Sequence, residues 1–518
     1  MACERVPTTV RTITLIRPKR FRWVYCQLEA LRHCFPGSVR HMLEELPESL
    51  DETYERILKG INKANREHAH RLLQCLTVAI RPLRVSELAE VLAVDFDTAS
   101  GSETPKLKTD WRWGDQEDAI LSTCSSLITV LDEHDNTSQE GMSQFEDASR
   151  VVRHSHSYSS RAVQFSHFSV KEFLTSPRLA TSNLDVSRFH ILLEPAHTIV
   201  ARACLATLLR SDDHVNEYDV NGRLPLAHYA AKHWIDHARF EGVSFHIREG
   251  MEILFDPDKP YFYAWIWIYD IDVRSHGDYS DLYFFGLTEK SGAAPLYYAA
   301  LCGFHDLAEH LIDKCSQQVN AIGGCYVSPL AAALRMGHFE LAHILYQRGA
   351  DLDVRGCYER TPLLGASITG DLGIIRWLLR RGADPNAVGV VDMINGWTPL
   401  HEAALTGNLD VAQTLLQDNA DTNIKNRHGE IPLHSALREA GSNVARLVLP
   451  QGVDLNARRE DGFTPLHVAS MYGRLEVARL LIEHGADIGA KDNRGATPFQ
   501  VAWRRSEMAE LLSENGPK

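Results

Sequence analysis

The stretch TPLHEAALTG at residues 398–407 is one copy of a phrase that recurs through the second half of the chain. The other copies are APLYYAALCG, SPLAAALRMG, TPLLGASITG, IPLHSALREA, TPLHVASMYG and TPFQVAWRRS. Their prolines are Pro295, Pro329, Pro362, Pro399, Pro432, Pro465 and Pro498, at spacings of 34, 33, 37, 33, 33 and 33 residues. Self-similarity at a fixed period indicates a repeat architecture, in which each unit covers the apolar face of its neighbour.

Each letter of the phrase has a mechanical role in a short helix. Thr398 is a residue type that caps helices, and Pro399 at the next position gives up an amide that has no partner there. Gly407 stands where the helix must end in a left-handed residue. The apolar positions within 411–416 form the stripe of a second helix. A 33-residue period with Thr-Pro-Leu-His is the ankyrin signature. We therefore expect a mainly α chain that ends in an ankyrin α-solenoid of about seven repeats over 291–518, the last one a cap.

Two repeats depart from this pattern. The repeat at 431 has Ala440 where its siblings have glycine, and Pro450 falls in the last turn of its second helix, where proline removes a hydrogen bond. We expect this repeat to be the loosest of the array. The repeat that starts at 361 ends in a connection four residues longer than the others, AVGVVDMINGW.

The first half of the chain is not a repeat. FRWVYCQLEALRHC at 21–34 has the apolar spacing of an amphipathic helix. LPESLDETYERIL at 46–58 opens with Ser49 and Glu52, which have the spacing of a capping box, and continues with one apolar helical face. The sequence therefore predicts helices in this region.

A small sheet is expected to follow. RPLRVSELAEVLAV at 81–94 indicates a turn, a cap at Ser86 and a helix. SSLITVL at 125–131 and AVQFSHFS at 162–169 are apolar enough for two paired strands, with a polar loop between them. Helices followed by a two-stranded wing predict a winged-helix domain, α with a small β wing.

Several of these segments carry a family resemblance. LPESLDETYERIL, PLRVSELAEVLAVDF, VQFSHFSVKEFL and AHTIVARACLATLL resemble the winged-helix segment of fungal NACHT-ankyrin proteins, which are NLR-like (STAND) signalling proteins. That module is often labelled the GPI-inositol-deacylase winged helix. In the family a nucleotide-binding domain precedes the winged helix and the repeats act as sensor. The resemblance implies a role in non-self recognition and cell-death pathways.

The resemblance, together with the repeats, implies four parts. We expect a remnant C-terminal helix of a NACHT-type domain at 1–45, a winged-helix domain at 46–185, a helical linker at 186–290 and the ankyrin repeats at 291–518. Within the linker, LPLAHYAAKHW at 224–234 resembles a degenerate repeat, and Pro260 begins a second candidate.

The chain departs from that family in its chemistry. A P-loop needs Gly-x-x-x-x-Gly-Lys-Ser/Thr to hold phosphates, and this chain contains no Gly-Lys dipeptide. We therefore expect a truncated relative or an incomplete gene model that lacks the ATPase core. His167 in FSHFSVKEFL is similar to the winged-helix histidine that contacts ADP in such relatives. With no P-loop, we favour the alternative of a hydrogen-bonded structural histidine.

Other candidate chemistry does not fit its context. GASITG at 365–370 nearly spells a nucleophile elbow, but its second glycine is one residue late and Ser367 falls on the first helix of a repeat. HDLAEH at 305–310 does not have metalloprotease spacing. HAH at 68–70 and HSH at 154–156 lack cysteine or carboxylate partners at ligand spacing. We therefore expect a protein that is not an enzyme and has no cofactor or metal.

Composition restricts the partners further. The net charge of −14 disfavours binding to nucleic acid or to anionic membranes, because both need a cationic surface. The ten cysteines include no Cys-x-x-Cys pair, which indicates free thiols in a reducing compartment. Residues 1–20 contain no signal-peptide run, and YFYAWIWIYD at 261–270 is about half the length that a bilayer needs. We expect a cytoplasmic protein without nucleic-acid or membrane partners.

The expected function is a non-catalytic scaffold that binds a protein partner on the concave face of the repeats. Hairpin tips and the ends of first helices are exposed there, and aromatic residues and arginine are favoured anchors. Trp397 is predicted to be an exposed anchor. The competing interpretation is that the longer loop folds back and Trp397 packs on Met393 or Ile394. By repeat position the candidates are Arg360, Trp397, Glu430 and Phe463 on the tips, and Thr406, Arg438 and Tyr472 on the helices.

Two other functions stay open at this point. A winged helix can bind DNA, but the helix at 86–94 carries Glu87 and Glu90, with Asp95 just after it. A recognition helix instead needs basic and amide side chains that face the groove. The remaining alternative is a fragment of a full-length NACHT signal-transduction ATPase.

Overall fold

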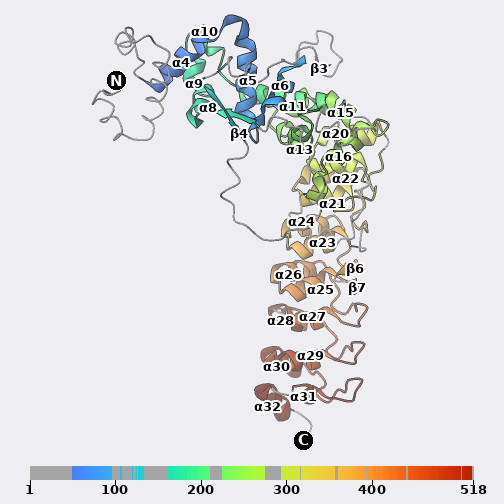
Figure 1. Cartoon of the computed structure of the whole chain (residues 1–518). Helices are drawn as coiled ribbons and strands as arrows, with labels where there is room; N and C mark the ends of the chain where they lie inside the picture. The colour runs from blue at the N-terminus through green and yellow to red at the C-terminus, as the bar shows by residue number, and fades with distance from the viewer. Residues whose placement is uncertain are drawn as a thin grey trace, which may run out of the picture. The chain divides into compact units, whose positions relative to one another are not determined.

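The computed structural model is mostly helical, as expected, and forms two compact units, Met1–Asp270 and Ile271–Lys518. Figure 1 traces the helices and strands of each unit. The described residues are 49–95, 106–107, 120, 124, 126–132, 161–210, 224–274, 293–315, 317–355, 360–391, 394–438, 442–502 and 505–515. The helix predicted at 21–34, the HSH stretch and Ala440 lie outside them.

The first described helix, α4 (Leu50–Gly60), begins where the capping box predicts. The Ser49 side chain accepts a hydrogen bond from the Glu52 amide at 3.1 Å. Tyr54 and Leu58, on the predicted apolar face, are fully buried. A local sequence signal therefore sets both the start of this helix and the face that it buries.

The predicted strands pair as expected. β4 (Ile128–Asp132) and β5 (Arg161–Phe165) are antiparallel, with Ile128 opposite Phe165. The structure adds a third strand, β1 (Leu83–Arg84), so that the sheet order is β1-β5-β4. With α5 (Arg66–Val78) before β1 and α6 (Val85–Leu92) after it, this arrangement is compatible with a winged helix.

The helix α6 begins two residues earlier than a cap at Ser86 would place it, because its N-cap is Arg84, so that prediction was wrong. The cause is Glu87, whose buried carboxylate accepts hydrogen bonds from the Arg84 amide at 2.7 Å and from the Arg81 guanidinium at 2.8 and 2.5 Å. These bonds close the first turn at Arg84, which becomes the N-cap residue.

The rest of the N-terminal unit packs around α11 (Leu193–Leu208), which lies against α5 and α13 (Ala227–Ala238). The apolar stretch at 261–270 forms the eight-residue helix α16 (Tyr261–Ile268), and Trp265 packs edge-on against the buried Trp234. Among the described residues, no helix combines the length and the apolar character needed to cross a membrane. The other elements are η3 (Lys63–Asn65), β2 (Val94–Asp95), β3 (Lys106–Leu107), α8 (Phe168–Leu174), α9 (Pro177–Ala180), α10 (Leu184–Ser187), α14 (Val243–His246) and α15 (Arg248–Leu254).

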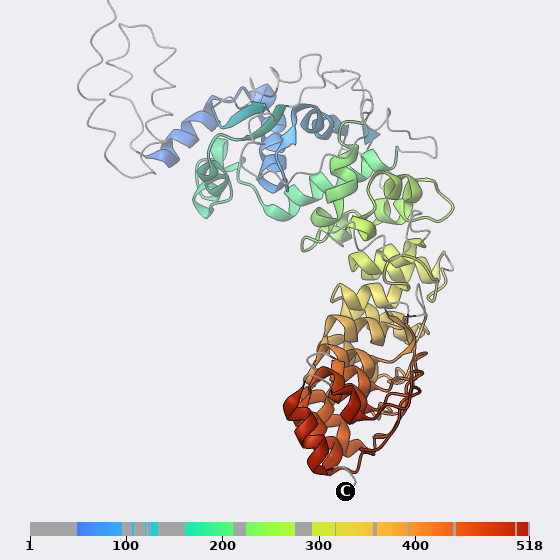
Figure 2. The same cartoon turned by 60° about the horizontal axis from the view of Figure 1, so that its bottom comes forward.

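The C-terminal unit is an array of helix pairs, which Figures 1 and 2 show stacked with their connecting loops along one side. A four-residue helix, α17 (Ile271–Arg274), precedes the array. Every inner helix begins at a proline of the recurring phrase, as predicted. The inner helices are α19 (Pro295–Cys302), α21 (Pro329–Arg335), α23 (Pro362–Thr369), α25 (Pro399–Thr406), α27 (Pro432–Arg438), α29 (Pro465–Tyr472) and α31 (Pro498–Val501). The outer helices are α20 (His305–Asp313), α22 (Phe339–Gln347), α24 (Leu372–Leu379), α26 (Leu409–Gln417), α28 (Ser442–Val448), α30 (Leu475–Glu483) and α32 (Ser506–Asn515).

The recurring residues act as the sequence predicts. The Thr398 hydroxyl accepts a hydrogen bond from the His401 amide at 3.3 Å and so caps α25. Gly407 ends that helix in the left-handed region, with φ 70°.

The described cysteines are free thiols: Cys75, Cys124, Cys204, Cys302, Cys315 and Cys325.

The buried histidine of the phrase connects one repeat to the next. In His401, Nδ1 accepts a hydrogen bond from the Thr398 amide at 3.2 Å, and Nε2 donates to the carbonyl oxygen of Glu430, in the next hairpin, at 2.9 Å. His434 and His467 repeat this arrangement toward Phe463 and Ala496. Because Nδ1 must accept, only the neutral ring fits this position.

Burial accordingly lowers the pKa of these histidines. The pKa of His401 falls from its ordinary 6.5 to about 4, and that of His434 to about 3. Burial also lowers the pKa of His467. In the unfolded chain each ring is protonated below about pH 6.5, so acid favours the unfolded state.

The repeat at 431 differs from its siblings in its outer helix. α28 has seven residues, whereas α26 and α30 have nine, and it gives way to a 3₁₀ turn, η7 (Leu449–Gln451), that contains Pro450. Proline has no amide hydrogen and cannot continue the α-helical bonding. The predicted disturbance at Pro450 is therefore visible as a shortened helix.

We predict that acid destabilises the array through its buried histidines. Lowering the pH from 7 to 5 should reduce the free energy of unfolding by about 2 kcal/mol for each histidine whose folded pKa is near 4. Urea denaturation of the wild type and of His401→Gln at both pH values measures this. Gln500 accepts the same capping amide bond in the last repeat, so glutamine is a matched replacement that does not titrate. Equal pH dependence in both proteins would contradict the prediction.

We predict faster hydrogen exchange in α28 than in α26 and α30. Stability in a repeat array is close to a nearest-neighbour sum, so a shortened unit opens locally at a lower free energy. Pro450→Gln restores the residue that α26 has at this position, Gln417, and should slow exchange in α28. Equal protection of the three helices in the wild type would count against this account.

Candidate partner-binding site

Trp397 is buried, which corrects the expectation that it is an exposed hairpin tip. Its side chain is 2% exposed and packs on Leu364, Ile368 and Leu405. Its indole Nε1 donates a hydrogen bond to the buried carboxylate of Glu402 at 3.0 Å. The competing interpretation, a structural tryptophan, therefore fits better. The side chains of Met393 and Ile394, its expected packing partners, lie outside the described part of the chain.

The longer connection explains this placement. Its residues pair as an antiparallel hairpin, β6 (Gly389–Val391) with β7 (Ile394–Trp397), and Gly389 lies opposite Trp397. Gly396 has φ 79°, and a Cβ atom there would lie 3.1 Å from the Asn426 backbone. The chain therefore turns sharply beside the next hairpin and directs the indole onto the inner helices.

Glu430 is the second candidate that is not exposed, at 3%. Its carboxylate accepts a hydrogen bond from Asn426 Nδ2 at 3.1 Å and forms an ion pair with Arg459, in the following hairpin, at 3.1 Å. Neutralisation by that arginine is what lets a carboxylate stay buried. Glu430 therefore connects consecutive hairpins, and its side chain is not on the surface.

The remaining candidates are at least partly accessible but are spread along the array. Thr406 is exposed, and its hydroxyl donates to the carbonyl of Glu402 at 2.9 Å. Phe463 is half-buried and stacks on His467 with ring centroids 5.3 Å apart. Arg438 and Tyr472 are half-buried on inner helices. The structure does not gather these residues into one site.

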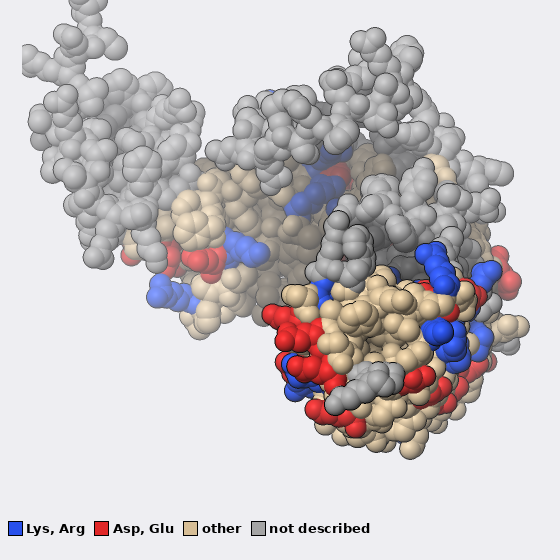
Figure 3. All heavy atoms as spheres, turned by 90° about the horizontal axis from the view of Figure 1, so that it is seen from below, with Lys and Arg blue, Asp and Glu red and all other residues tan. Residues whose placement is uncertain are grey.

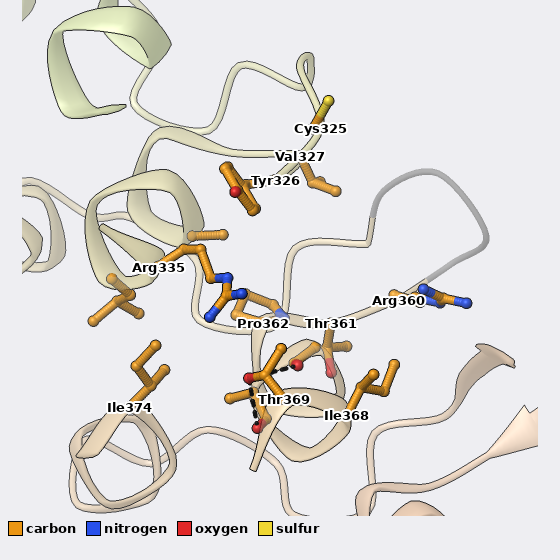
Figure 4. A pocket seen from close by; sticks show the side chains of 14 residues that line it. Cys325, Tyr326, Val327, Arg335, Arg360, Thr361, Pro362, Ile368, Thr369 and Ile374 are labelled. Atoms are coloured by element: carbon orange, nitrogen blue, oxygen red, sulfur yellow. Dashed lines mark hydrogen bonds between the residues drawn. The ribbon is translucent and has the colours of Figure 1, made fainter. Parts of the chain in front are cut away.

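Arg360 is the candidate that lies in a cavity. A pocket of about 250 Å³ opens between α21 and α23 (Figure 4). Arg360 lies at its edge and donates from Nε to the carbonyl oxygen of Val390 at 2.9 Å. α21 and α23 approach each other less closely than the other successive inner helices do, so this junction is the open one.

Sequence reasoning missed three residues of this pocket. Arg335 projects from α21 toward α23, and Val327 forms part of the hairpin wall (Figure 4). Gly365 on α23 also lines the pocket and leaves space there. A signal for Gly365 was present, because it is a glycine inside a helix. At the same position the sibling repeats carry Ala332, Glu402, Ser435 and Val468.

The hairpin tips form a basic edge on a protein with a net charge of −14. Figure 3 shows acidic and basic side chains side by side along both edges of the C-terminal end of the array. Glu460 and Asp461 are also exposed on the tips, where Glu460 contacts His428 and Asp461 pairs with Arg459. The exposed tip cations are Arg355, Lys425, Arg427, Arg458, Lys491 and Arg494.

The rejected chemical motifs sit in structural positions. Ser367 lies within α23, as expected, and its hydroxyl donates to the carbonyl of Leu363 at 2.9 Å. His167 caps α8, and its Nδ1 accepts a hydrogen bond from the Ser169 amide at 3.2 Å. The favoured interpretation of His167 as a hydrogen-bonded structural residue agrees with this geometry.

Comparison with known families agrees with the helical array. The ankyrin-repeat family matches residues 296–389, 363–459 and 433–518. Residues 296–518 are ankyrin repeats. The two candidate repeats at 224–234 and at Pro260 lie before this segment and stay a prediction.

Three relatives extend the comparison. The chain is 30% identical to azaphilone pigments biosynthesis cluster protein L of Monascus ruber over 324 residues, 60% of this chain and 61% of that protein. It is 30% identical to ankyrin repeat and SAM domain-containing protein 6 of Mus musculus over 97 residues, 18% of this chain and 11% of that protein. It is 29% identical to ankyrin repeat protein nuc-2 of Neurospora crassa over 96 residues, 18% and 9% of the two chains. The matches span less than two thirds of the length of each relative.

The match to protein L is longer than the ankyrin segment, so it includes residues N-terminal to the repeats. The similarity to that fungal protein therefore extends beyond the repeat signature. The other two matches have about the length of three repeats and concern a much smaller part of each chain.

We predict that Trp397 stabilises the fold. Trp397→Ala should lower the free energy of unfolding by about 3–5 kcal/mol, because it leaves a cavity beside Leu364 and removes a donor from Glu402. For a unit of this size the melting temperature should fall by roughly 8–15 °C. Tyr472→Ala, which truncates a half-buried aromatic residue, is the control and should have a smaller effect. A melting temperature within about two degrees of the wild type, together with weakened partner binding, would restore the anchor hypothesis.

Proposed function

We propose that this protein is a non-catalytic interaction scaffold whose ankyrin repeats bind a protein partner on their concave face. The observation that carries this proposal is the stacking of the helix pairs, with their connecting hairpins along one side of the array (Figures 1 and 2) and a pocket open between α21 and α23. Stacked repeats create extended surfaces of this kind, and other ankyrin-type solenoids use them for binding. In such an interface the charged hairpin tips would form the polar rim, and the pocket would hold a buried anchor residue of the partner.

We also propose that the N-terminal unit is a winged helix of the type found in NLR-like fungal proteins. The sequence resemblance supports this, as does the sheet order β1-β5-β4 that follows α5 and α6. Similarity to a fungal relative that reaches beyond the repeats is a second support. In this proposal the protein works in the cytoplasm in a non-self recognition or cell-death pathway. That the chain is a fragment of a NACHT ATPase stays a prediction.

The DNA-binding alternative has less support. Almost every residue of α6 is buried, and Glu90 accepts a hydrogen bond from the Leu226 amide at 2.8 Å. A helix held in this way does not offer a face to a DNA groove. A gel shift with random duplex DNA at low and high salt separates the two functions, because DNA binding by surface cations weakens steeply with salt.

We predict that partner binding depends on the inner side of the repeats. Thr406→Arg places a long charged side chain at the exposed end of α25 and should weaken partner capture at least tenfold. Gln413→Arg makes a similar change on the exposed side of α26, in the same repeat, and should leave capture unchanged. Both positions are on the surface, so stability should change by only about 0.5 kcal/mol.

The measurement is quantitative pull-down by the tagged full chain from an extract of the organism that encodes it, with melting curves for each variant. Loss of capture in Gln413→Arg but not in Thr406→Arg would place the interface on the outer helices. A set of captured proteins that is the same for wild type and both variants would contradict the proposal.

A further inference from the structure

We infer that the pocket between α21 and α23 recognises a partner segment that presents one large apolar side chain next to a carboxylate. This inference rests on the proposed scaffold function and names the chemistry of the partner at one place on the array. The occupant is an extended segment of another protein, because the pocket is small and lies between the inner helices that line the proposed binding side.

The size of the pocket fits a side chain. Its volume of about 250 Å³ is below the range of roughly 300–1,000 Å³ that holds drug-sized ligands. Leu334, Ile368 and Ile374 supply aliphatic lining, and Tyr326 supplies an aromatic wall. An apolar anchor that enters such a slot is the usual centre of a binding hot spot.

The pocket exists because α23 has no side chain at Gly365. A Cβ atom added to Gly365 would meet nothing within 4 Å, so the space in front of it is open. In the neighbouring repeats a side chain occupies the equivalent position, and Glu402 there accepts the indole bond of Trp397. The junction between α23 and α25 is therefore closed, and the junction between α21 and α23 is open.

One wall of the pocket is held in a strained conformation. Val327 has φ 78°, and the Ser328 amide donates to the carbonyl of Tyr326 at 2.9 Å, which together describe a tight γ-turn. A β-branched residue rarely adopts a positive φ. Such strain persists only where the surrounding structure imposes it, and it is concentrated at functional sites.

A buried polar network holds Val327 in its strained conformation. Asp272 accepts hydrogen bonds from the Tyr297 hydroxyl at 2.8 Å and from the Cys325 amide at 2.7 Å. The Tyr297 oxygen in turn accepts the Tyr326 amide at 3.1 Å. These bonds fix the two residues that precede Val327, so the pocket is formed before a ligand arrives, which reduces the entropic penalty of binding.

The charge at the pocket selects an anionic neighbour for the apolar side chain. Arg335 is exposed, and within the described residues it has no hydrogen-bond or ion-pair partner. Arg360 is the second cation of the lining, and no carboxylate is among the lining residues. In Figure 4 the two guanidinium groups lie at different sides of the pocket. Arg335 is therefore placed to form a forked pair with a carboxylate that flanks the anchor.

The first test selects peptides that bind the wild type and asks whether a variant with a filled pocket still binds them. A phage library of random seven-residue peptides is panned on the full chain, and Gly365→Leu serves for counter-selection. Leucine is a better helix former than glycine, so this variant should melt at the same temperature or higher. Gly365→Ala adds a single methyl group and should keep at least half of the affinity, which separates filling of the pocket from any change to the helix.

The second test reverses one charge. Arg335→Glu should weaken the selected peptides at least tenfold. Arg438→Glu makes the same change at the equivalent position of α27, three repeats further on, and should leave binding within twofold. Repeats stack at roughly 10 Å, whereas seven residues span at most about 25 Å, so a peptide in the pocket does not reach Arg438.

The expected result is a set of peptides that bind the wild type, lose at least tenfold in Gly365→Leu, and share a large apolar residue within two positions of Asp or Glu. No enrichment, a consensus without an acidic residue, or equal binding to Gly365→Leu would each overturn the inference. Binding of sodium octanoate as tight as that of the peptides would assign the pocket to small carboxylic acids and also overturn it. If the protein partner depends on Thr406 while the pocket variants change nothing, the scaffold function stands and the pocket inference fails.

Discussion

The array depends on one hydrogen-bonding constraint: a buried neutral imidazole must serve two hairpins at once. His401 accepts the amide that opens its own helix and donates to the carbonyl of the next hairpin. This bond pair couples the cap of one helix to the hairpin that follows it. In the first repeat Tyr297 stands at the position of the histidine, and there its hydroxyl and the Asp272 carboxylate hold the hairpin at Cys325 and Tyr326. That hairpin has a different turn, in which both Gly324 and Val327 are left-handed.

The same comparison explains why one junction is open. At the other junctions the inner helix has a side chain at the position that corresponds to Gly365. Between α23 and α25, Trp397 of the longest connection also packs on residues of both inner helices. The space between α21 and α23 stays empty for two reasons. Gly365 has no side chain, and the strained hairpin holds Val327 at the wall of the pocket. A glycine inside a helix costs about 1 kcal/mol relative to alanine, so the pocket exists at the expense of stability.

Much of this fold could be predicted from sequence because its signals are local. Prolines marked the start of each inner helix, Ser49 marked the start of α4, and apolar runs marked β4 and β5. The errors concern side-chain contacts that no pattern in the sequence shows. Ser86 looked like a cap, but Glu87 accepts hydrogen bonds from the Arg84 amide and the Arg81 guanidinium, and these bonds set the helix start. Trp397 and Glu430 held hairpin positions that are usually exposed, yet contacts with neighbouring repeats bury both. Arg335 and Val327 had no sequence signal, because the pocket arises from the spacing of two helices and not from a motif.

The shortened helix α28 divides the array into two mechanical blocks. Coupling between repeats acts only through neighbours, so the repeats after Pro450 share cooperativity with the rest mainly through this unit. A pulling force on the C-terminus would release those repeats as one block. The junction between α21 and α23 lies on the other side of the weak unit, so a protein held there would stay bound to an array that had already lost its end.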